Sequence, residues 1–417
     1  MDTKCLCFKL LNHGIFGHQI FNMDNMVFIP DFKDISIAFR DKNNSELKQS
    51  YWLFKGMNAP FLVNIGSKIG MFALHWSFPF VGDIIKQTIF KQFCGGTSLK
   101  ESLPVIERLG KQQIFSVLDY GAEGKSSEEE FDFTLQEAKR AVDFAQRSGF
   151  NPFVSTKLTG LVKQEILEDI ALGKILSEEA KIAFDRFKDR VDSLCALAAE
   201  KNVSVLIDAE ESWIQQPIDD LANAMMEKYN RKKAIIYNTF QMYRKDRLSF
   251  LKDSFHLSKE KKFILGAKLV RGAYMEKENK RAEDLNYESP IHISKEYTDK
   301  SFNDGIQFCL DHYQEMASMN ASHNVHSVSI QVDEMAKKSI PFNHHNLYFC
   351  QLMGMSDILT FNLANAGFNV GKYVVYGQIK EVIPYLIRRA EENSSVTGDM
   401  SRELGLVKAE MIRRKIL

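Results

Sequence analysis

Short apolar, β-rich runs alternate with longer amphipathic, charged stretches along most of this chain after Gly95 and Gly96. The short runs have the length and residue types of buried strands. We expect them at Gln113–Leu118, Phe153–Leu158, Val203–Ile207, Ala234–Tyr237, Phe263–Leu269, Ser318–Ser322, Asn346–Gln351 and Lys372–Tyr376. Helical patterns separate them, for example at Glu128–Ser148, Ser177–Lys201, Ile218–Tyr229 and Ser294–Tyr313. Eight such β–α units predict an α/β fold, a (β/α)8 TIM-type barrel with its helices outside.

An open, doubly wound parallel sheet is the alternative to the barrel. That fold binds dinucleotides through a G-x-G-x-x-G turn directly after a strand. The sequence has no such turn after any expected strand. The closed barrel is therefore the favoured architecture.

The charge balance and the cysteines exclude several classes of function. Lysine and arginine number 54, and so do aspartate and glutamate, among 417 residues. No global field draws the chain to nucleic acid or anionic lipid, so any cationic function must be local. The six cysteines form no C-x-x-C pair, which argues against a zinc site and a disulfide framework, and fits a reducing compartment. We expect no metal site.

The region before the barrel has a different character. Residues 1–95 are expected to form a leader and a helical arm, with some of the first 25 residues as a dispensable leader. Phe61–Phe90 is strongly apolar, which favours packing against the core, with a membrane interface as the alternative. The barrel is expected to occupy residues 96–395, and a C-terminal helix residues 396–417.

Polar residues stand at or just beyond the ends of almost all the expected strands. Active sites of such barrels are built at the carboxyl ends of the strands. A single residue of this kind more often forms an ion pair or a cap on the rim of the barrel. Polar residues at the ends of almost all the strands together predict a functional site. These residues are Asp119, Lys157, Asp208, Glu210, Asn238, Gln241, Lys268, Arg271, His323, Asn324 and Tyr373.

The segment YLIRRAEENSS, from Tyr385 to Ser395, places two arginines side by side. Neighbouring helical residues point about 100° apart, so Arg388 and Arg389 do not ordinarily serve one surface. One interpretation is a solvated helix face with an Arg388–Glu392 pair. The other is a helix end above a pocket, where two guanidinium groups trap a small carboxylate.

Seven segments together resemble the proline dehydrogenase family, flavin-dependent (β/α)8 enzymes that oxidise proline to 1-pyrroline-5-carboxylate. The resemblance runs in unbroken order from about Phe93 to Ser395, and GAKLVRGAYM and YLIRRAEENSS are its most specific parts. The segments are LDYGAEG (118–124), STKLTGL (155–161), LIDAEES (206–212), NTFQMY (238–243), GAKLVRGAYMEKE (266–278), SHN (322–324) and KYVVYGQIKEVIPYLIRRAEENSS (372–395).

The resemblance implies a substrate site at the mouth of the barrel. Arg388, Arg389 and Lys157 are expected to hold the carboxylate of L-proline, with Asp208 as the partner of Lys157. Several cations in a closed pocket require counter-charges nearby.

Further residues are implied around the substrate. Glu123 is expected to pair with Arg388 when the site closes, and Glu392 to fix the arginine helix or the substrate. Tyr274 and Tyr373 are expected to pack around the pyrrolidine ring. A small residue at the position of Tyr373 marks hydroxyproline-specific relatives, so tyrosine favours unsubstituted proline.

FAD is the cofactor that the resemblance implies. Lys268 is expected to hydrogen-bond the flavin N5 atom, Arg271 to neutralise the pyrophosphate and Gln241 to bind the edge of the isoalloxazine. Further cofactor contacts are expected from Gly272, His323 and Asn324.

The resemblance also implies the fate of the electrons. Relatives pass them to a membrane quinone, so a peripheral membrane contact is expected. The enzyme is expected to be monofunctional and to lie in the bacterial cytoplasm at the inner membrane, with the matrix side of the mitochondrial inner membrane as the alternative. Three other functions remain open: a hydroxyproline-preferring enzyme, a Schiff-base lyase using Lys157 or Lys268, and a non-catalytic binding barrel.

Overall fold

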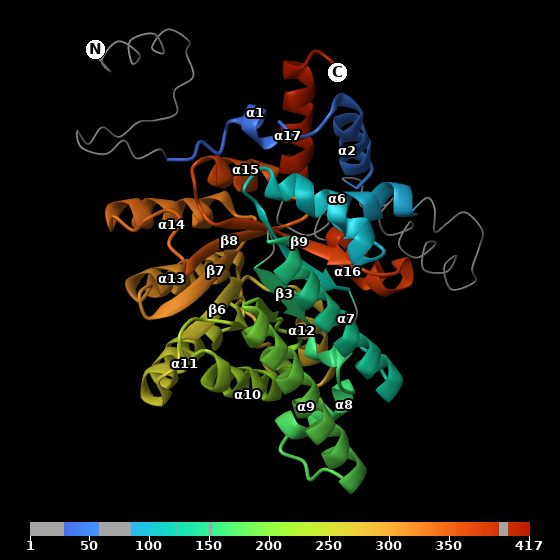
Figure 1. Cartoon of the computed structure of the whole chain (residues 1–417), viewed down its shortest axis with the longest axis vertical. Coiled ribbons are helices and arrows are strands. Elements are labelled where there is room, and N and C mark those ends of the chain that lie inside the picture. Colours follow the sequence, from blue (N-terminus) through green and yellow to red (C-terminus); the bar gives the residue numbers. More distant parts are fainter. Residues whose placement is uncertain (1–28, 58–84, 122, 150–151, 392–398) are drawn as a thin grey trace.

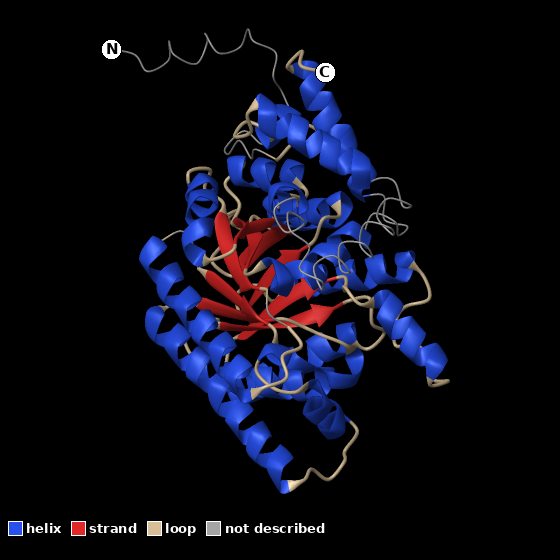
Figure 2. Ribbon diagram, turned by 90° about the vertical axis from the view of Figure 1, so that its right-hand side faces the viewer, coloured by secondary structure: helices blue, strands red, loops and turns tan. Residues whose placement is uncertain are grey.

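A closed parallel barrel forms the centre of the protein (Figures 1 and 2). The computed structural model describes residues 29–57, 85–121, 123–149, 152–391 and 399–417. Each strand pairs with the next, and β9 pairs with both β8 and β2, which closes the barrel. The eight strands are β2 (Phe115–Tyr120), β3 (Phe153–Thr156), β4 (Ser204–Ile207), β5 (Ile236–Gln241), β6 (Leu265–Val270), β7 (Met316–Ala321), β8 (Leu347–Leu352) and β9 (Val370–Tyr376).

The predicted (β/α)8 fold is therefore confirmed. The expected and observed strands differ mainly in where they begin and end. The strand expected at Ala234–Tyr237 is β5, which continues through Asn238 and Thr239 to Gln241. The sequence predicts Asn238 and Gln241 to lie at the end of the strand, yet the hydrogen bonds of Asn238 and Thr239 allow this polar segment to stay buried inside the fold. A ninth strand, β1 (Cys94–Gly96), adds to β9 beside Val375 and Tyr376. Three residues are too few to give a periodic signal.

Helices cover the outside of the barrel (Figure 2). Their ends follow local signals: α7 (Glu128–Ser148) starts with a capping box between Ser127 and Glu130 and stops at Gly149, whose φ of 68° suits glycine. The other covering helices are α6 (Leu99–Gly110), α8 (Gln164–Ala171), α9 (Glu178–Lys201), α10 (Ser212–Tyr229), α11 (Arg247–Lys261), α12 (Met275–Asp284), α13 (Lys295–Asp311), α14 (Val325–Lys337), α15 (Asp357–Asn365) and α16 (Ile379–Glu391).

Aromatic rings fill the amino-terminal end of the barrel. Phe153 contacts the rings of Phe115, Tyr237 and Tyr348, with centroids 5.0 to 5.6 Å apart. A side chain at Gly371 would lie 2.2 Å from the Phe115 ring, so this position requires glycine. This packed floor leaves only the opposite, carboxyl-terminal end of the barrel for chemistry.

The two ends of the described chain pack together. Helix α17 (Asp399–Arg413) lies beside α2 (Asn44–Met57) at the top of Figure 1, next to the short helix α1 (Ile35–Ala38). The buried carboxylate of Glu410 accepts bonds from Arg413 and Arg414. Arg414 also donates to the carbonyl oxygens of Phe39 and Lys42, 2.7 Å from each.

The described end of the apolar segment Phe61–Phe90 includes a π-helix (Lys86–Phe90), which runs into α5 (Lys91–Phe93). Most of the apolar arm expected at Phe61–Phe90, and the whole of the expected leader, lie outside the described residues. Within the described ranges, no helix combines the length and apolarity needed to span a bilayer.

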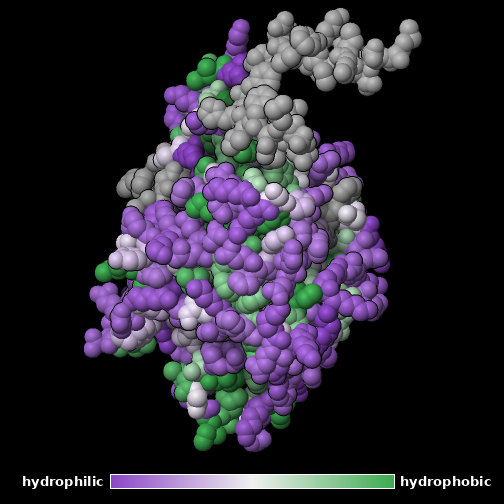
Figure 3. All heavy atoms as spheres, turned by 90° about the vertical axis from the view of Figure 1, so that its left-hand side faces the viewer, coloured by the Kyte–Doolittle hydropathy of each residue, from purple (hydrophilic) through white to green (hydrophobic). Residues whose placement is uncertain are grey.

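A cavity of about 1040 Å³ lies between α2, α6 and α16. Apolar and polar residues line it in similar numbers, and Met353 and Gly354, which directly follow β8, are among them. At the lower end of the molecule, Leu172, Ile175 and Ile182 around the α8–α9 connection are more than half exposed. Apolar side chains gather at that end in Figure 3, while the face above is mostly hydrophilic.

Candidate active site

A buried network of charges occupies the carboxyl-terminal end of the barrel, above the aromatic floor. Asp208, just after β4, forms an ion pair with Lys268 of β6 and accepts a hydrogen bond of 2.5 Å from the Tyr373 hydroxyl of β9. Tyr373 also hydrogen-bonds to Ser155 of β3, and its ring lies 5.1 Å from the Lys268 ammonium. Four strands thus contribute to one connected cluster.

Lys157 joins this cluster from the end of β3. Its ammonium lies 3.2 Å from Asp119 of β2 and 3.6 Å from Asp208, the partner expected from the sequence. The nearer carboxylate is therefore Asp119, and Asp208 is shared between two lysines. One oxygen of Asp119, Oδ1, has no hydrogen-bond partner among the residues that the structure describes. That atom remains able to accept a hydrogen bond from a ligand.

The two carboxylates have different electrostatic surroundings. Burial raises the pKa of Asp119, and the nearby Lys157 only partly offsets this. Burial also acts on Asp208, but Lys268, Lys157 and the Tyr373 hydroxyl outweigh it and lower the pKa of Asp208. Burial alone would lower the pKa of Lys157, yet Asp119 and Asp208 raise it above its ordinary value. Asp208 is therefore ionised and Lys157 is a cation at neutral pH.

Arg388 of α16 and Glu123 form a second charged pair at the mouth. Both guanidinium Nη atoms donate to the Glu123 carboxylate, at 2.7 and 3.1 Å. The guanidinium also lies 5.7 Å from the Tyr274 ring centroid. Burial raises the pKa of Glu123, but the bond and charge of Arg388 outweigh it and lower that pKa. The structure thus brings Glu123, Arg388 and Tyr274 together.

Arg389 lies beside Arg388 but has different neighbours. It is 5% exposed, and its guanidinium lies 5.1 Å from the ring of Tyr385. Its charge also acts on His323, which follows β7. The two arginines are therefore both partly or fully buried at the barrel mouth, which excludes the solvated helix face. Glu392 lies outside the described residues.

The residues expected to bind the cofactor lie in or directly after β5, β6 and β7. Gln241 is buried and donates through Nε2 to the carbonyl oxygen of Glu210 at 2.7 Å. Arg271 donates to Asp299 at 2.8 Å and to the hydroxyls of Ser322 and Ser327 at 2.7 and 2.9 Å. Gly272 has a φ of +142°, and a side chain there would lie 2.5 Å from the Tyr243 ring.

The amino terminus of α14 lies next to Arg271. Asn324 caps this helix by accepting a bond of 3.0 Å from the Ser327 backbone N–H, so its side chain has a structural role. A cationic guanidinium beside a helix amino terminus makes a site suited to phosphate groups. This arrangement fits the pyrophosphate of a dinucleotide.

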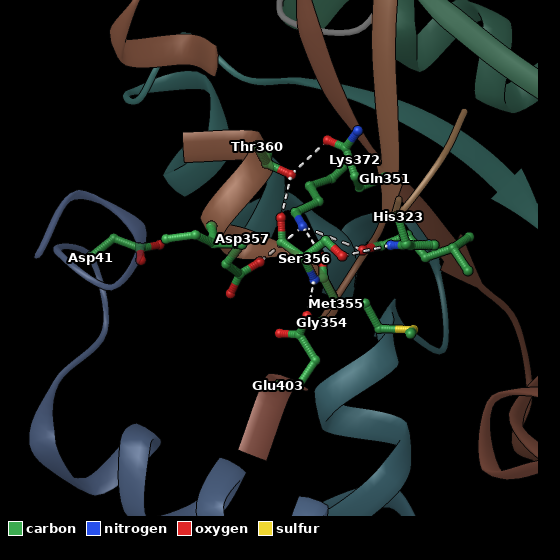
Figure 4. Close-up of polar contacts among 12 residues, drawn as sticks. Asp41, His323, Gln351, Gly354, Met355, Ser356, Asp357, Thr360, Lys372 and Glu403 are labelled. Atoms are coloured by element: carbon green, nitrogen blue, oxygen red, sulfur yellow. Dashed lines mark hydrogen bonds and ion pairs between the residues drawn. The ribbon is translucent and has the colours of Figure 1, made fainter. Parts of the chain in front are cut away.

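His323 is held by residues that no sequence pattern connects with it (Figure 4). Its Nδ1 lies 3.0 Å from the hydroxyl of Ser356, and Arg402 of α17 donates to that hydroxyl and to the His323 carbonyl oxygen. Burial, followed by Lys372 and Arg389, lowers the pKa of His323 well below its usual value. The ring is therefore neutral at physiological pH.

A buried lysine–aspartate–lysine cluster lies outside the barrel and supports the loop that carries Ser356 (Figure 4). Asp357 lies 2.9 Å from both Lys42 and Lys372, and Lys372 also donates to the carbonyl oxygen of Met355. Burial raises the pKa of Asp357, but the two lysines outweigh it and hold that pKa well below its ordinary range. Tyr373 and Lys372 are neighbours in β9. One strand therefore contributes a residue to the charged cluster at the barrel mouth and a residue to the lysine–aspartate–lysine cluster outside the barrel.

Sequence patterns missed several of these participants. Asp119 and Glu210 were recognised as strand-end residues but received no role. Ser155 lies inside a strand and Arg402 lies in the last helix, where neither has a local signal. Only the three-dimensional contacts bring them to the site.

Comparison with known proteins identifies the family to which the chain belongs. A sequence profile described as proline dehydrogenase matches residues 102–402. Proline dehydrogenase 1, mitochondrial, of Dictyostelium discoideum is 32% identical over 432 residues, which cover 91% of this chain and 74% of the relative. Hydroxyproline dehydrogenase of Xenopus laevis is 29% identical over 421 residues, 90% of this chain and 89% of the relative.

A solved structure shares the fold. Proline utilization A (PutA) from Bdellovibrio bacteriovorus, inactivated by N-propargylglycine, superposes with a TM-score of 0.69 at 22% identity. The match covers 87% of this chain and 38% of that chain, so this chain spans well under half of the solved protein. The profile match includes the barrel and the arginine helix, and on this ground the chain belongs to the proline dehydrogenase family.

Proposed function

We propose that this chain oxidises L-proline to 1-pyrroline-5-carboxylate, with FAD as cofactor and a quinone as the electron acceptor. The observation that carries the proposal is the gathering of partly or fully buried cations from three elements at the barrel mouth: Lys157 after β3, Lys268 of β6, and Arg388 and Arg389 of α16. Such a set suits a small carboxylate. Membership of the family supports the same substrate.

The carboxylate of proline would bind to Arg388, Arg389 and Lys157. Asp208 and Asp119 offset the charge of Lys157, and Glu123 offsets that of Arg388, so the cations stay buried when no substrate is bound. Tyr274 and Tyr373 would pack against the pyrrolidine ring and fix its orientation. Accurate positioning of the reacting carbon is the main contribution of these residues.

The residues at the mouth fit FAD. Arg271 and the amino terminus of α14 suit its pyrophosphate, and Gln241, Lys268, Gly272, His323 and Asn324 would complete the cofactor site. When bound, FAD would accept a hydride from proline C5 at its N5 atom. Lys268 adds positive charge, which would favour the reduced cofactor, while Asp208 keeps that ammonium in place.

A hydroxyproline-oxidising enzyme is the second candidate, because the Xenopus laevis relative bears that name. Tyr373 argues against it. Its hydroxyl is already bonded to Ser155 and Asp208, so the ring has a fixed position that leaves little room for a substituent. A Schiff-base lyase that uses Lys157 is disfavoured, since that chemistry requires a lysine of lowered pKa and the pKa of Lys157 is raised.

A membrane-associated location is part of the proposal, because the quinone is a lipid-soluble acceptor. The name of the Dictyostelium discoideum relative places that protein in mitochondria. This favours the mitochondrial inner membrane, matrix side, over the bacterial cytoplasm that was expected first. The apolar arm at Phe61–Phe90 remains the candidate contact.

The test is an assay of purified protein with L-proline and a soluble quinone analogue. The proposal predicts quinone reduction that depends on proline, with 1-pyrroline-5-carboxylate identified by mass spectrometry. Oxidation of hydroxyproline at a higher kcat/KM than proline would support the second candidate instead. Release of carbon dioxide from the substrate, or its covalent trapping on a lysine by borohydride, would indicate lyase chemistry. Either result would contradict both the proline-oxidising and the hydroxyproline-oxidising function.

A further inference from the structure

Glu210 is a buried carboxylate whose polar groups all have partners in the described part of the chain. It lies three residues after β4 and is 3% exposed. Its N–H donates to Gln215 at 2.8 Å, and its carbonyl oxygen accepts from Gln241 at 2.7 Å. Its carboxylate accepts from the backbone N–H of Thr159 at 3.0 Å and bonds to the Thr159 hydroxyl. A buried carboxylate bound in this way fixes the segments around it.

Thr159 connects Glu210 to the loop that carries Glu123. Thr159 lies in the 3-10 turn Leu158–Gly160, directly after Lys157. Its hydroxyl oxygen lies 3.4 Å from the Gly124 backbone N–H, and its carbonyl oxygen accepts from the Lys125 N–H at 3.2 Å. Both amides come from the two residues that follow Glu123. Hydrogen bonds therefore connect Glu210, through Thr159, to the backbone of the loop that carries Glu123.

We propose that Glu210 is a positioning residue, which holds the 123–125 loop through Thr159 and so sets how firmly Glu123 binds Arg388. The loop and its partners form the geometric basis of this inference. Its consequence for the affinity of proline rests on the proposed function, but the control of the loop does not.

The charge state of Glu210 affects how firmly the 123–125 loop is held. Burial raises the pKa of Glu210 to about 7, and the carboxylates of Glu211 and Glu123 add to the rise. Glu211 pairs with Lys277 of α12, Glu123 pairs with Arg388, and the phenol of Tyr274 also faces this group.

Ionisation of Glu210 changes its bond with Thr159. The ionised carboxylate accepts a hydrogen bond from the Thr159 hydroxyl, and its charge polarises that hydroxyl, which makes the hydroxyl oxygen a stronger acceptor for the Gly124 N–H. A protonated carboxyl donates to the hydroxyl oxygen instead, and this polarisation by a negative charge is lost. The loop is therefore held more firmly above pH 7 than below it.

Hydrogen exchange of the Gly124 and Lys125 amides tests the loop directly, without substrate or activity. Glu210→Gln resembles the protonated acid, and Thr159→Val removes the hydroxyl that Thr159→Ser keeps. The protection factors of both amides are expected to fall at least fivefold in Glu210→Gln and Thr159→Val at pH 8. Thr159→Ser and an exposed carboxylate control in α8, Glu165→Gln, should match the unmodified protein.

The pH dependence provides the second readout. Protection in the unmodified protein should rise between pH 6 and pH 8 after correction for intrinsic exchange, and Glu210→Gln should show no such rise. Circular dichroism establishes that each variant is folded. Unchanged protection in Glu210→Gln, or the same pH dependence as the unmodified protein, would overturn the inference.

Kinetics then test the consequence for the reaction. Glu210→Gln is expected to raise the KM for L-proline three- to tenfold at pH 8, with kcat within twofold. At pH 6 the two proteins should have similar KM values. Equal KM values at pH 8 would overturn the link to Arg388. Absence of proline oxidation in the unmodified protein would instead refute the proposed function, and the exchange experiment would still decide the role of Glu210.

Discussion

The guanidinium of Arg388 binds both carboxylate oxygens of Glu123, at 2.7 and 3.1 Å, across 265 positions of the sequence. This pair links α16 to the loop after β2, and both side chains are about one fifth exposed. It therefore lies at the boundary between the buried cluster and solvent. A pair in that position can rearrange when a substrate carboxylate arrives.

Glu123→Gln tests this pair. A neutral amide cannot replace the charged, two-point bond, so Arg388 would be held less firmly over the mouth. We expect the KM for L-proline to rise about five- to tenfold, the effect of losing one charged hydrogen bond. Glu129→Gln, which changes an exposed carboxylate in the following helix, is the control and should leave KM unchanged. A KM for Glu123→Gln equal to that of the control would remove the pair from substrate binding.

Arg389→Met tests the carboxylate site itself. The variant keeps the apolar stem of the side chain and loses the guanidinium that is 5% exposed. We expect the KM for L-proline to rise at least about tenfold while the flavin remains bound. Arg389→Lys retains the charge but not the planar guanidinium, so the increase in KM should be smaller than in Arg389→Met. Unaltered saturation by proline in Arg389→Met would refute the assignment.

Tyr373→Ser tests the packing of the substrate ring. The change removes the phenol that fills the space beside Lys268 and breaks its bonds to Ser155 and Asp208. The ratio of kcat/KM for hydroxyproline to that for proline is expected to increase by about tenfold, in the range that one added contact or relieved clash supplies. Tyr348→Phe, on the barrel floor, is the matched control. A ratio that stays constant would count against the ring contact.

Asp357→Asn tests the support beneath His323. The change leaves Lys42 and Lys372 buried without their shared counter-charge, and should destabilise the protein by about 3 kcal/mol at pH 7. Asp284→Asn, in an exposed pair with Lys280, should cost less than about 0.5 kcal/mol. Denaturant unfolding measures both.

The pH dependence of that loss has a definite sign. The folded state lowers the pKa of Asp357 below its ordinary value of 3.8, so its ionised form stabilises the fold above that pH. This stabilisation is lost as the pH falls below 3.8. The difference between Asp357→Asn and the unmodified protein should therefore shrink in acid, and a difference that grows there would contradict the role of the cluster.

The barrel could be predicted from the sequence because its eight strands are continuous apolar runs between amphipathic helices. Helix α7 was predicted to the residue, since Ser127 and Gly149 are strong local start and stop signals. β5 was cut short at Tyr237 because Asn238 looks like a loop residue, although its amide is bonded to the buried Asp219. Polar residues inside a strand are recognisable only when their partners are known.

The candidate site was predictable to the extent that it lies at strand ends and in specific motifs. Lys157, Asp208, Lys268 and Tyr373 do meet in one cluster. Thr159 and Arg402 could not be found, because their partners are distant in the sequence and neither stands in a periodic pattern. Likewise, Lys372 was read only as the first residue of a strand, whereas its pairing with Asp357 depends on which side of β9 it faces.

The most direct test is the visible absorption spectrum of the purified protein, loaded with FAD, before and after the anaerobic addition of L-proline. The account predicts the bands of bound oxidised flavin and their bleaching by proline. A protein that binds no flavin, or a bound flavin whose bands persist in excess proline, would contradict it.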